Sequence, residues 1–136
     1  MDMVEEAKEK RWRCRGVRGA TTVTENSTKA ILAATRELLL AIVEANEIEI
    51  DDVASIFFTT TPDLNSNYPA LAARQLGWTD TALLCAHEMD VEWGMPLCVR
   101  VLIHWNTTNS LSEVQHVYLH EARNLRTDKY PLPPVG

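Results

Sequence analysis

The sequence predicts an α+β fold, in which a mixed sheet of about five strands carries two main helices on one face. Apolar residues recur at helical spacing over 27–46, and Pro69 opens a second helical stretch over 70–76. β-Branched and aromatic runs lie before, between and after these stretches and indicate strands. Because two helices cannot cover both faces of such a sheet, the second face must be polar or meet another subunit.

The order of the elements follows from local signals. Asn26 or Ser27 can cap the first helix, which should run to about Asn46. Gly77 should close the second helix, and Ser110-Leu111-Ser112-Glu113 matches a capping box that starts a short helix. The expected strands cover 13–24, 53–60, 81–86, 98–105 and 115–120.

Composition limits the class of protein. The chain has 136 residues, 46% of them hydrophobic, and a net charge of −6, which argues against binding nucleic acid. Its three cysteines form no CxxC pair, and no stretch reaches the roughly 20 apolar residues of a membrane helix. We therefore expect a cytoplasmic protein without a membrane anchor. The domain should cover 13–128, with an N-terminal extension over 1–12 and a flexible tail over 129–136.

Arginines stand where they should be costly to desolvate. Arg15 and Arg18 lie in the strand-like stretch 13–24, and Arg100 interrupts the apolar run Cys98-Val99-Arg100-Val101-Leu102-Ile103. On a strand, Arg100 shares one face with Leu102 and His104, while Val99, Val101 and Ile103 share the other. Its partner could be a carboxylate of the protein, from Glu88, Asp90 or Glu92, or an anionic ligand.

Other patterns give weaker signals. Gly16 and Gly19 have the GxxG spacing of a KH loop, but that loop must join two helices, and this one lies in a strand. His116 and His120 could ligate a metal, yet no third ligand has suitable spacing. Cys85 lacks an evident base and is better explained as a packed or polar residue. We expect neither a metal nor a cofactor, because the usual nucleotide and metal motifs are absent.

Six separated segments, in the same order, resemble the monofunctional chorismate mutases of the AroH type. The segments are Arg15–Val23, Thr61–Leu64, Tyr68-Pro69-Ala70 with Arg74, Glu88–Val91, Val99–Val101 and His116–Leu119, followed by Leu125-Arg126 with Asp128. The resemblance implies a homotrimer with clefts between subunits. It also implies the rearrangement of chorismate to prephenate, on the route to phenylalanine and tyrosine, without any cofactor.

The same resemblance implies roles for individual residues. Arg100 should face the ether oxygen of the substrate, Arg18 should bind a carboxylate with help from Tyr118, and Glu88 should accept a hydrogen bond from the ring hydroxyl. The remaining substrate contacts are Cys85 beside that hydroxyl, Tyr68 from a neighbouring subunit, Arg74 at the entrance, and Leu125 and Arg126 in a closing C-terminal segment.

The chain also departs from the family pattern. Leu71 occupies a position that often carries a lysine, and Tyr68 one where phenylalanine is familiar. Two other functions stay open at this point: a non-catalytic binder of small anions on the same scaffold, and a trimeric enamine or imine deaminase of related architecture. Loss of chorismate absorbance on incubation with the protein would separate them.

Overall fold

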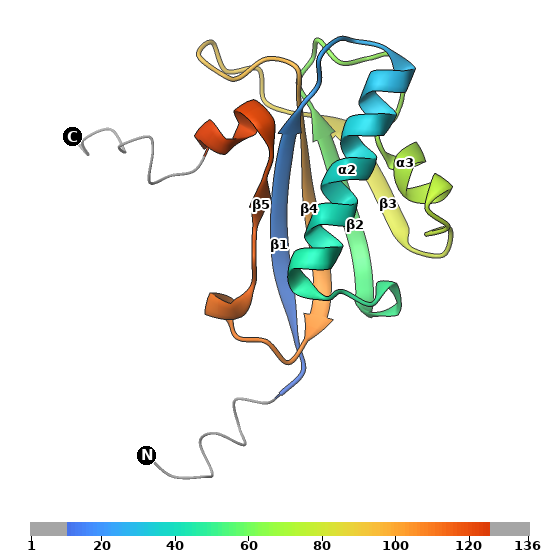
Figure 1. Ribbon diagram of the computed structural model, residues 1–136, viewed down its shortest axis with the longest axis vertical. Coiled ribbons are helices and arrows are strands. Elements are labelled where there is room, and N and C mark those ends of the chain that lie inside the picture. Colours follow the sequence, from blue (N-terminus) through green and yellow to red (C-terminus); the bar gives the residue numbers. More distant parts are fainter. Residues whose placement is uncertain (1–10, 126–136) are drawn as a thin grey trace, which may run out of the picture.

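A computed structural model describes residues 11–125, which form a five-stranded mixed sheet with two α-helices on one face (Figure 1). The sheet order is β3-β2-β4-β1-β5. This architecture confirms the predicted fold class. The strands are β1 (Arg13–Thr22), β2 (Val53–Thr60), β3 (Ala82–His87), β4 (Cys98–Thr107) and β5 (Val117–Tyr118). The α-helices are α2 (Thr28–Asn46) and α3 (Ala70–Gln75), and the 3-10 helices are η1 (Ile50–Asp52), η2 (Leu111–Glu113) and η3 (His120–Leu125).

The central strand β4 runs antiparallel to both of its neighbours, β1 and β2. The outer strands run parallel to theirs, β3 beside β2 and β5 beside β1. Two crossovers, through α2 and through α3, connect β1 to β2 and β2 to β3. Both helices contribute to one apolar core on the same side of the sheet (Figure 1).

Alternation along β4 divides the sheet into a core face and an open face. Val99, Val101 and Ile103 are buried beneath the helices, whereas Arg100 and Leu102 face away from them. This is the division that the sequence predicts. Leu38, Leu39 and Ile42 of α2 cover the core face. The helix approaches Gly19 so closely that a Cβ atom there would lie 2.5 Å from Ile42 Cδ1.

Of the two predicted caps of α2, Ser27 is the one that the structure uses. Its side-chain oxygen accepts a hydrogen bond from Ala30 N at 3.1 Å. Asn26 instead ties the loop after β2 in place, because its Oδ1 accepts from the backbone N–H groups of Asn65 and Ser66. The helix ends where Glu47 takes a left-handed conformation with φ 54°.

The fifth strand is shorter than predicted, and the expected range 115–120 is wrong at both ends. The backbone of Gln115 is bonded to the side chain of Asn46, through two contacts of 2.8 Å, instead of to a strand. After β5, His120 takes a left-handed conformation with φ 53° and begins η3. His120 therefore does not share a strand face with Tyr118.

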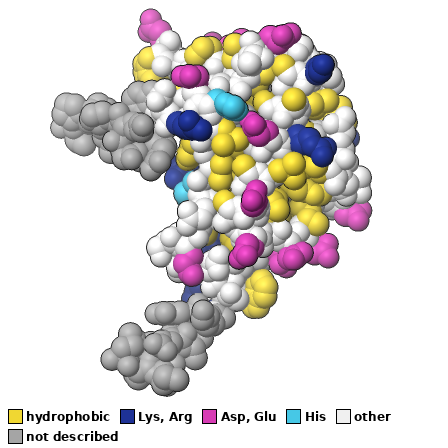
Figure 2. All heavy atoms as spheres, viewed as in Figure 1, with side chains coloured by type: hydrophobic (Ala, Val, Ile, Leu, Met, Phe, Trp, Pro, Cys, Tyr) yellow, Lys and Arg dark blue, Asp and Glu magenta, His cyan; other side chains and the backbone are white. Residues whose placement is uncertain are grey.

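The open face of the sheet carries large apolar side chains. Leu84, Phe57 and Leu102 are direct neighbours on β3, β2 and β4, and they are 59%, 40% and 36% exposed. The opposite face carries α2 and has acidic side chains scattered over it (Figure 2). No helix within residues 11–125 combines the length and apolarity that crossing a membrane would need.

Candidate active site

A cavity of about 450 Å³ on the open face brings together five of the residues that the sequence predicts for the site. Strands β1, β4 and β5 supply Arg18, Arg100 and Tyr118, the turn after β3 supplies Glu88, and the end of η3 supplies Leu125. The rest of the lining comes from Gly19, Ala20, Phe57, Thr59, Val101 and Leu102.

Arg100 is partly paired within the protein. Its Nε lies 3.7 Å from Glu88 Oε2, which is close enough for an ion pair but too long for a hydrogen bond. That Nε is buried, and within the described residues it has no hydrogen-bond partner. A buried donor without a partner is costly, so a ligand that accepts from it would bind with an advantage. The predicted pair with Glu88 therefore exists and still leaves Arg100 a free donor.

Glu88 is fixed by the strand that precedes it and by two donors. Its backbone N–H donates to Thr60 O at 2.8 Å, which continues the pairing between β2 and β3. Thr59 Oγ1 donates to Oε2 at 3.0 Å, and Met89 N donates to Oε1 at 3.2 Å. The carboxylate is thus held at the rim of the cavity with part of its acceptor capacity unused.

Arg18 and Tyr118 come from opposite ends of the chain and meet because β5 pairs with β1. The backbone N–H of Arg18 donates to His116 Nδ1 at 3.0 Å, which fixes the strand beside the site. Burial lowers the pKa of His116 from its ordinary 6.5, and the positive charge of Arg18 lowers it further. A neutral imidazole is the form that can accept this bond.

The site presents two guanidinium groups, a phenol and a carboxylate, a set that suits a small anion bearing a hydroxyl group. A nucleophilic role for the nearby Cys98 does not fit its surroundings. Its side chain is 1% exposed, and burial raises its pKa although Arg100 acts in the opposite direction. The arrangement is therefore equipped to bind and polarise a ligand rather than to form a covalent adduct.

A second cavity of about 430 Å³ contains two other predicted residues, Tyr68 and Cys85. Tyr68 is 73% exposed, and Cys85 pairs with Phe58, so its side chain lies on the core side of the sheet. Burial raises the pKa of Cys85, while a hydrogen bond from Ala70 and the charge of Arg74 on α3 act against the rise. Within one chain, these residues stand apart from Arg100 and Glu88.

Arg126, the last predicted residue of the site, lies outside the described residues. His116 and His120, the alternative metal pair, have separate partners, because His120 Nε2 lies 2.8 Å from Glu37 Oε1. Among residues 11–125, no three His, Cys, Asp or Glu side chains are grouped as metal ligands would be.

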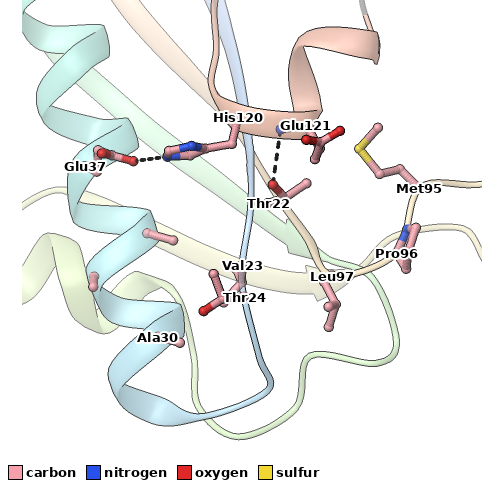
Figure 3. Close-up of a pocket in the computed structure, with 12 residues that line it drawn as sticks. Thr22, Val23, Thr24, Ala30, Glu37, Met95, Pro96, Leu97, His120 and Glu121 are labelled. Atoms are coloured by element: carbon pink, nitrogen blue, oxygen red, sulfur yellow. Dashed lines mark hydrogen bonds and ion pairs between the residues drawn. The ribbon is translucent and has the colours of Figure 1, made fainter.

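A larger cavity, of about 780 Å³, lies between α2, η3 and the segment 95–97 (Figure 3). Its floor is apolar, and its polar end carries Glu37, His120 and Glu121. None of the described residues that line it is Lys or Arg. Its two carboxylates would repel a small anion. The cavity of about 450 Å³ around Arg100 is therefore the candidate active site, although it is smaller.

Sequence reasoning missed Thr59 and Phe57 as members of the site. Both lie on the open face of β2, where Thr59 is paired with Arg100 and Phe57 with Leu102. Strand alternation alone could have placed Thr59 and Phe57 on the same face of β2. It could not have shown that β2 lies beside β4, and this neighbourhood is what brings the two side chains to Arg100 and Leu102.

Residues 11–125 form an α+β unit whose cavity carries cationic donors and acceptors of the kind that suit a compact anion. Residues 14–129 match the family model described as chorismate mutase type I, and the chain belongs to this family. It is 50% identical over 115 residues to the chorismate mutase AroH of Thermus thermophilus, with 84% of this chain and 94% of that protein covered.

Two further comparisons also find chorismate mutases. The chorismate mutase AroH of Bacillus subtilis (strain 168) is 40% identical over 115 residues, which cover 84% of this chain and 91% of that protein. A solved chorismate mutase from Clostridium thermocellum superposes with a TM-score of 0.79 at 46% identity, covering 80% of this chain and 97% of the other.

Proposed function

We propose that this protein is an isomerase that rearranges chorismate to prephenate, on the route to phenylalanine and tyrosine. Membership of the type I chorismate mutase family supports the reaction. The observation that carries the proposal in this chain is the buried Nε of Arg100, which lacks a hydrogen-bond partner in the cavity that also holds Arg18, Glu88 and Tyr118.

The reaction is a Claisen-type rearrangement within one molecule: an ether C–O bond breaks while a C–C bond forms, and no proton is transferred. A catalyst can therefore act by holding the folded conformer and by stabilising the charge that separates as the bond breaks. No general base and no nucleophile are needed. The donors and cations around the cavity are of the kind that this chemistry uses.

Each residue has a proposed part. Arg100 donates to the ether oxygen as it becomes negative, and Arg18, with the Tyr118 hydroxyl, binds a substrate carboxylate. Glu88 accepts a hydrogen bond from the ring hydroxyl and balances positive charge on the ring. Leu125 packs over the substrate.

We propose further that the protein is a homotrimer whose sites lie between chains. The exposed row of Leu84, Phe57 and Leu102 supports an interface on the open face. Tyr68 and Cys85 of a neighbouring chain would complete the cavity, which would explain why they stand apart from Arg100 within one chain. Arg74 would line the entrance. Sedimentation equilibrium should give a trimer, and a fully active monomer would refute this.

The activity itself has a direct test. Purified protein, dialysed exhaustively against a chelator, should remove chorismate as followed by its ultraviolet absorbance, with prephenate as the product. Absence of turnover with retained binding would identify the alternative, a non-catalytic binder of small anions. A loss of activity that one metal restores would contradict the expectation that no metal is needed.

Two further proposals concern the whole chain. The domain boundaries 13–128 are supported by the family match over 14–129. The cytoplasmic location rests on Cys14, Cys85 and Cys98, all of which are free thiols in the structure.

A further inference from the structure

The hydroxyl of Thr59 binds the carboxylate oxygen of Glu88 that lies nearest to Arg100, so it contacts the point where the two charged groups of the proposed mechanism meet. It donates to Glu88 Oε2 at 3.0 Å, and the same oxygen lies 3.7 Å from Arg100 Nε. The second carboxylate oxygen is held by Met89 N at 3.2 Å. Glu88 is therefore fixed by neutral donors, one on each oxygen, and its contact with Arg100 is the longest of the three.

The sheet register places Thr59 between the strands that carry these groups. On one side it is paired with Arg100 of β4, and on the other with Ala86 of β3, two residues before Glu88. Because Thr59 is β-branched, its side chain has few accessible rotamers on a strand. The hydroxyl is thus aimed by the backbone, and it lines the same cavity as Arg100 and Glu88.

Without this hydroxyl, Met89 N would still hold Oε1 of Glu88, and Oε2 would be left with the charged Arg100 Nε beside it. A guanidinium and a carboxylate favour a shorter, two-pronged contact than the one observed. Such a contact would occupy the Arg100 Nε that now has no partner, and it would use acceptor capacity of the Glu88 carboxylate that a ligand could otherwise use. Both groups would then be less available to a ligand.

We propose that Thr59 is a positioning residue, which holds Glu88 back from Arg100 so that both stay free for the substrate. The inference rests on the proposed roles of Arg100 and Glu88. It adds that their spacing is maintained by a third side chain, one that needs no contact with the reacting bond.

Thr59→Val tests this directly, because it replaces the hydroxyl with a methyl group of similar size. A lost hydrogen bond to a charged group corresponds to roughly a tenfold to hundredfold effect, so kcat should fall by about that factor. KM should change less, because Arg18 and Tyr118 remain. Thr59→Ser, which keeps the hydroxyl, should recover most of the lost rate. Thr59→Ala serves as a second variant if the valine form does not fold.

A matched control comes from the same face of the same strand. Ser55 Oγ lies 3.0 Å from His104 Nδ1 and does not line the cavity, so Ser55→Ala should leave kcat and KM unchanged. Measuring the effect of Thr59→Val in a Glu88→Gln background tests whether Thr59 acts through Glu88, which a merely structural role would not require. If Thr59 acts through Glu88, its substitution should cost much less in the Gln background than in the wild type.

The outcomes are distinct. A folded Thr59→Val enzyme with kcat within about twofold of the wild type, or equal losses in the two backgrounds, would overturn the proposal while wild-type turnover stands. A wild-type protein without activity on chorismate would instead refute the proposed function. Melting temperatures of all the variants separate these results from a general loss of folding.

Discussion

Replacing Arg100 with alanine should lower kcat on chorismate by about 10²–10³-fold. Removal of one preorganised donor to a developing oxyanion typically costs that much. A Coulomb estimate agrees, because unit charges about 4 Å apart at an effective dielectric of about 20 interact by about 4 kcal/mol, or roughly 10³ in rate. The Arg100 side chain is 41% exposed, so solvent screening favours the lower part of this range.

The loss should appear in kcat because the charge on the ether oxygen grows only as the bond breaks. Arg100→Lys keeps the charge but loses the planar fork and its Nε, so it should also be strongly impaired. Arg74→Ala is the matched comparison. Arg74 is an exposed arginine on α3, outside the cavity, and its loss should act mainly on KM.

Steady-state kinetics by chorismate absorbance, with circular dichroism to verify folding, measures all three variants. A folded Arg100→Ala enzyme with near-normal kcat would show that the electrostatic mechanism is wrong. An Arg74→Ala variant impaired as strongly in kcat as Arg100→Ala would show that the two arginines have been assigned the wrong roles.

Three further predictions concern pH and packing. Because no proton is transferred, kcat should be nearly flat from about pH 6 to about pH 9, and a bell-shaped profile near neutrality would indicate acid–base chemistry instead. Burial lowers the pKa of His116 in the folded chain, so the unfolded chain binds more protons just below pH 6.5. The free energy of unfolding should therefore fall as the pH drops through that window. His116→Gln should make this pH dependence weaker in urea titrations. An unchanged pH dependence would show that other groups cause it. Gly19→Ala places a Cβ 2.5 Å from Ile42 Cδ1 and should destabilise the fold by about 1–3 kcal/mol. Gly16→Ala, whose Cβ would lie 3.4 Å from Leu102 Cδ1, should cost less, and equal melting temperatures for the two variants would contradict the packing argument.

Much of the fold could be predicted because its local signals agree with its packing. The cap at Ser27, the alternation around Arg100 and the capping box at Ser110 are all read from neighbouring residues, and all three are present. The fifth strand was overestimated because its ends depend on distant groups. Asn46 binds the backbone of Gln115, a contact between residues 69 positions apart that periodicity cannot show.

For the candidate site as well, some features could be predicted from neighbouring residues and others depend on the sheet order. An arginine in an apolar strand is visible in the sequence, and it indicates a partner among Glu88, Asp90, Glu92 or an anionic ligand. The structure selects Glu88 among the three carboxylates. The role of Thr59 depends on the sheet order, which places β2 between β3 and β4. The family resemblance implies that Tyr68 comes from a neighbouring subunit, which agrees with its distance from Arg100 within one chain. That Cys85 joins Tyr68 depends on the register of β3, which places the Cys85 side chain on the core side of the sheet.

The pairing of β5 with β1 has a consequence for how the protein folds. The backbone N–H of Arg18 binds the ring of His116, which lies 98 positions further along, so the cavity cannot form until nearly the whole chain has been synthesised. Contacts of such long range make folding slow and delay the closing of the sheet edge. A nascent chain that ends before residue 117 lacks the edge strand, and Gly19 and Ala20 of β1 are then unpaired on that side. In this protein, the completion of the candidate active site and the completion of the β5 edge of the sheet are therefore the same late event.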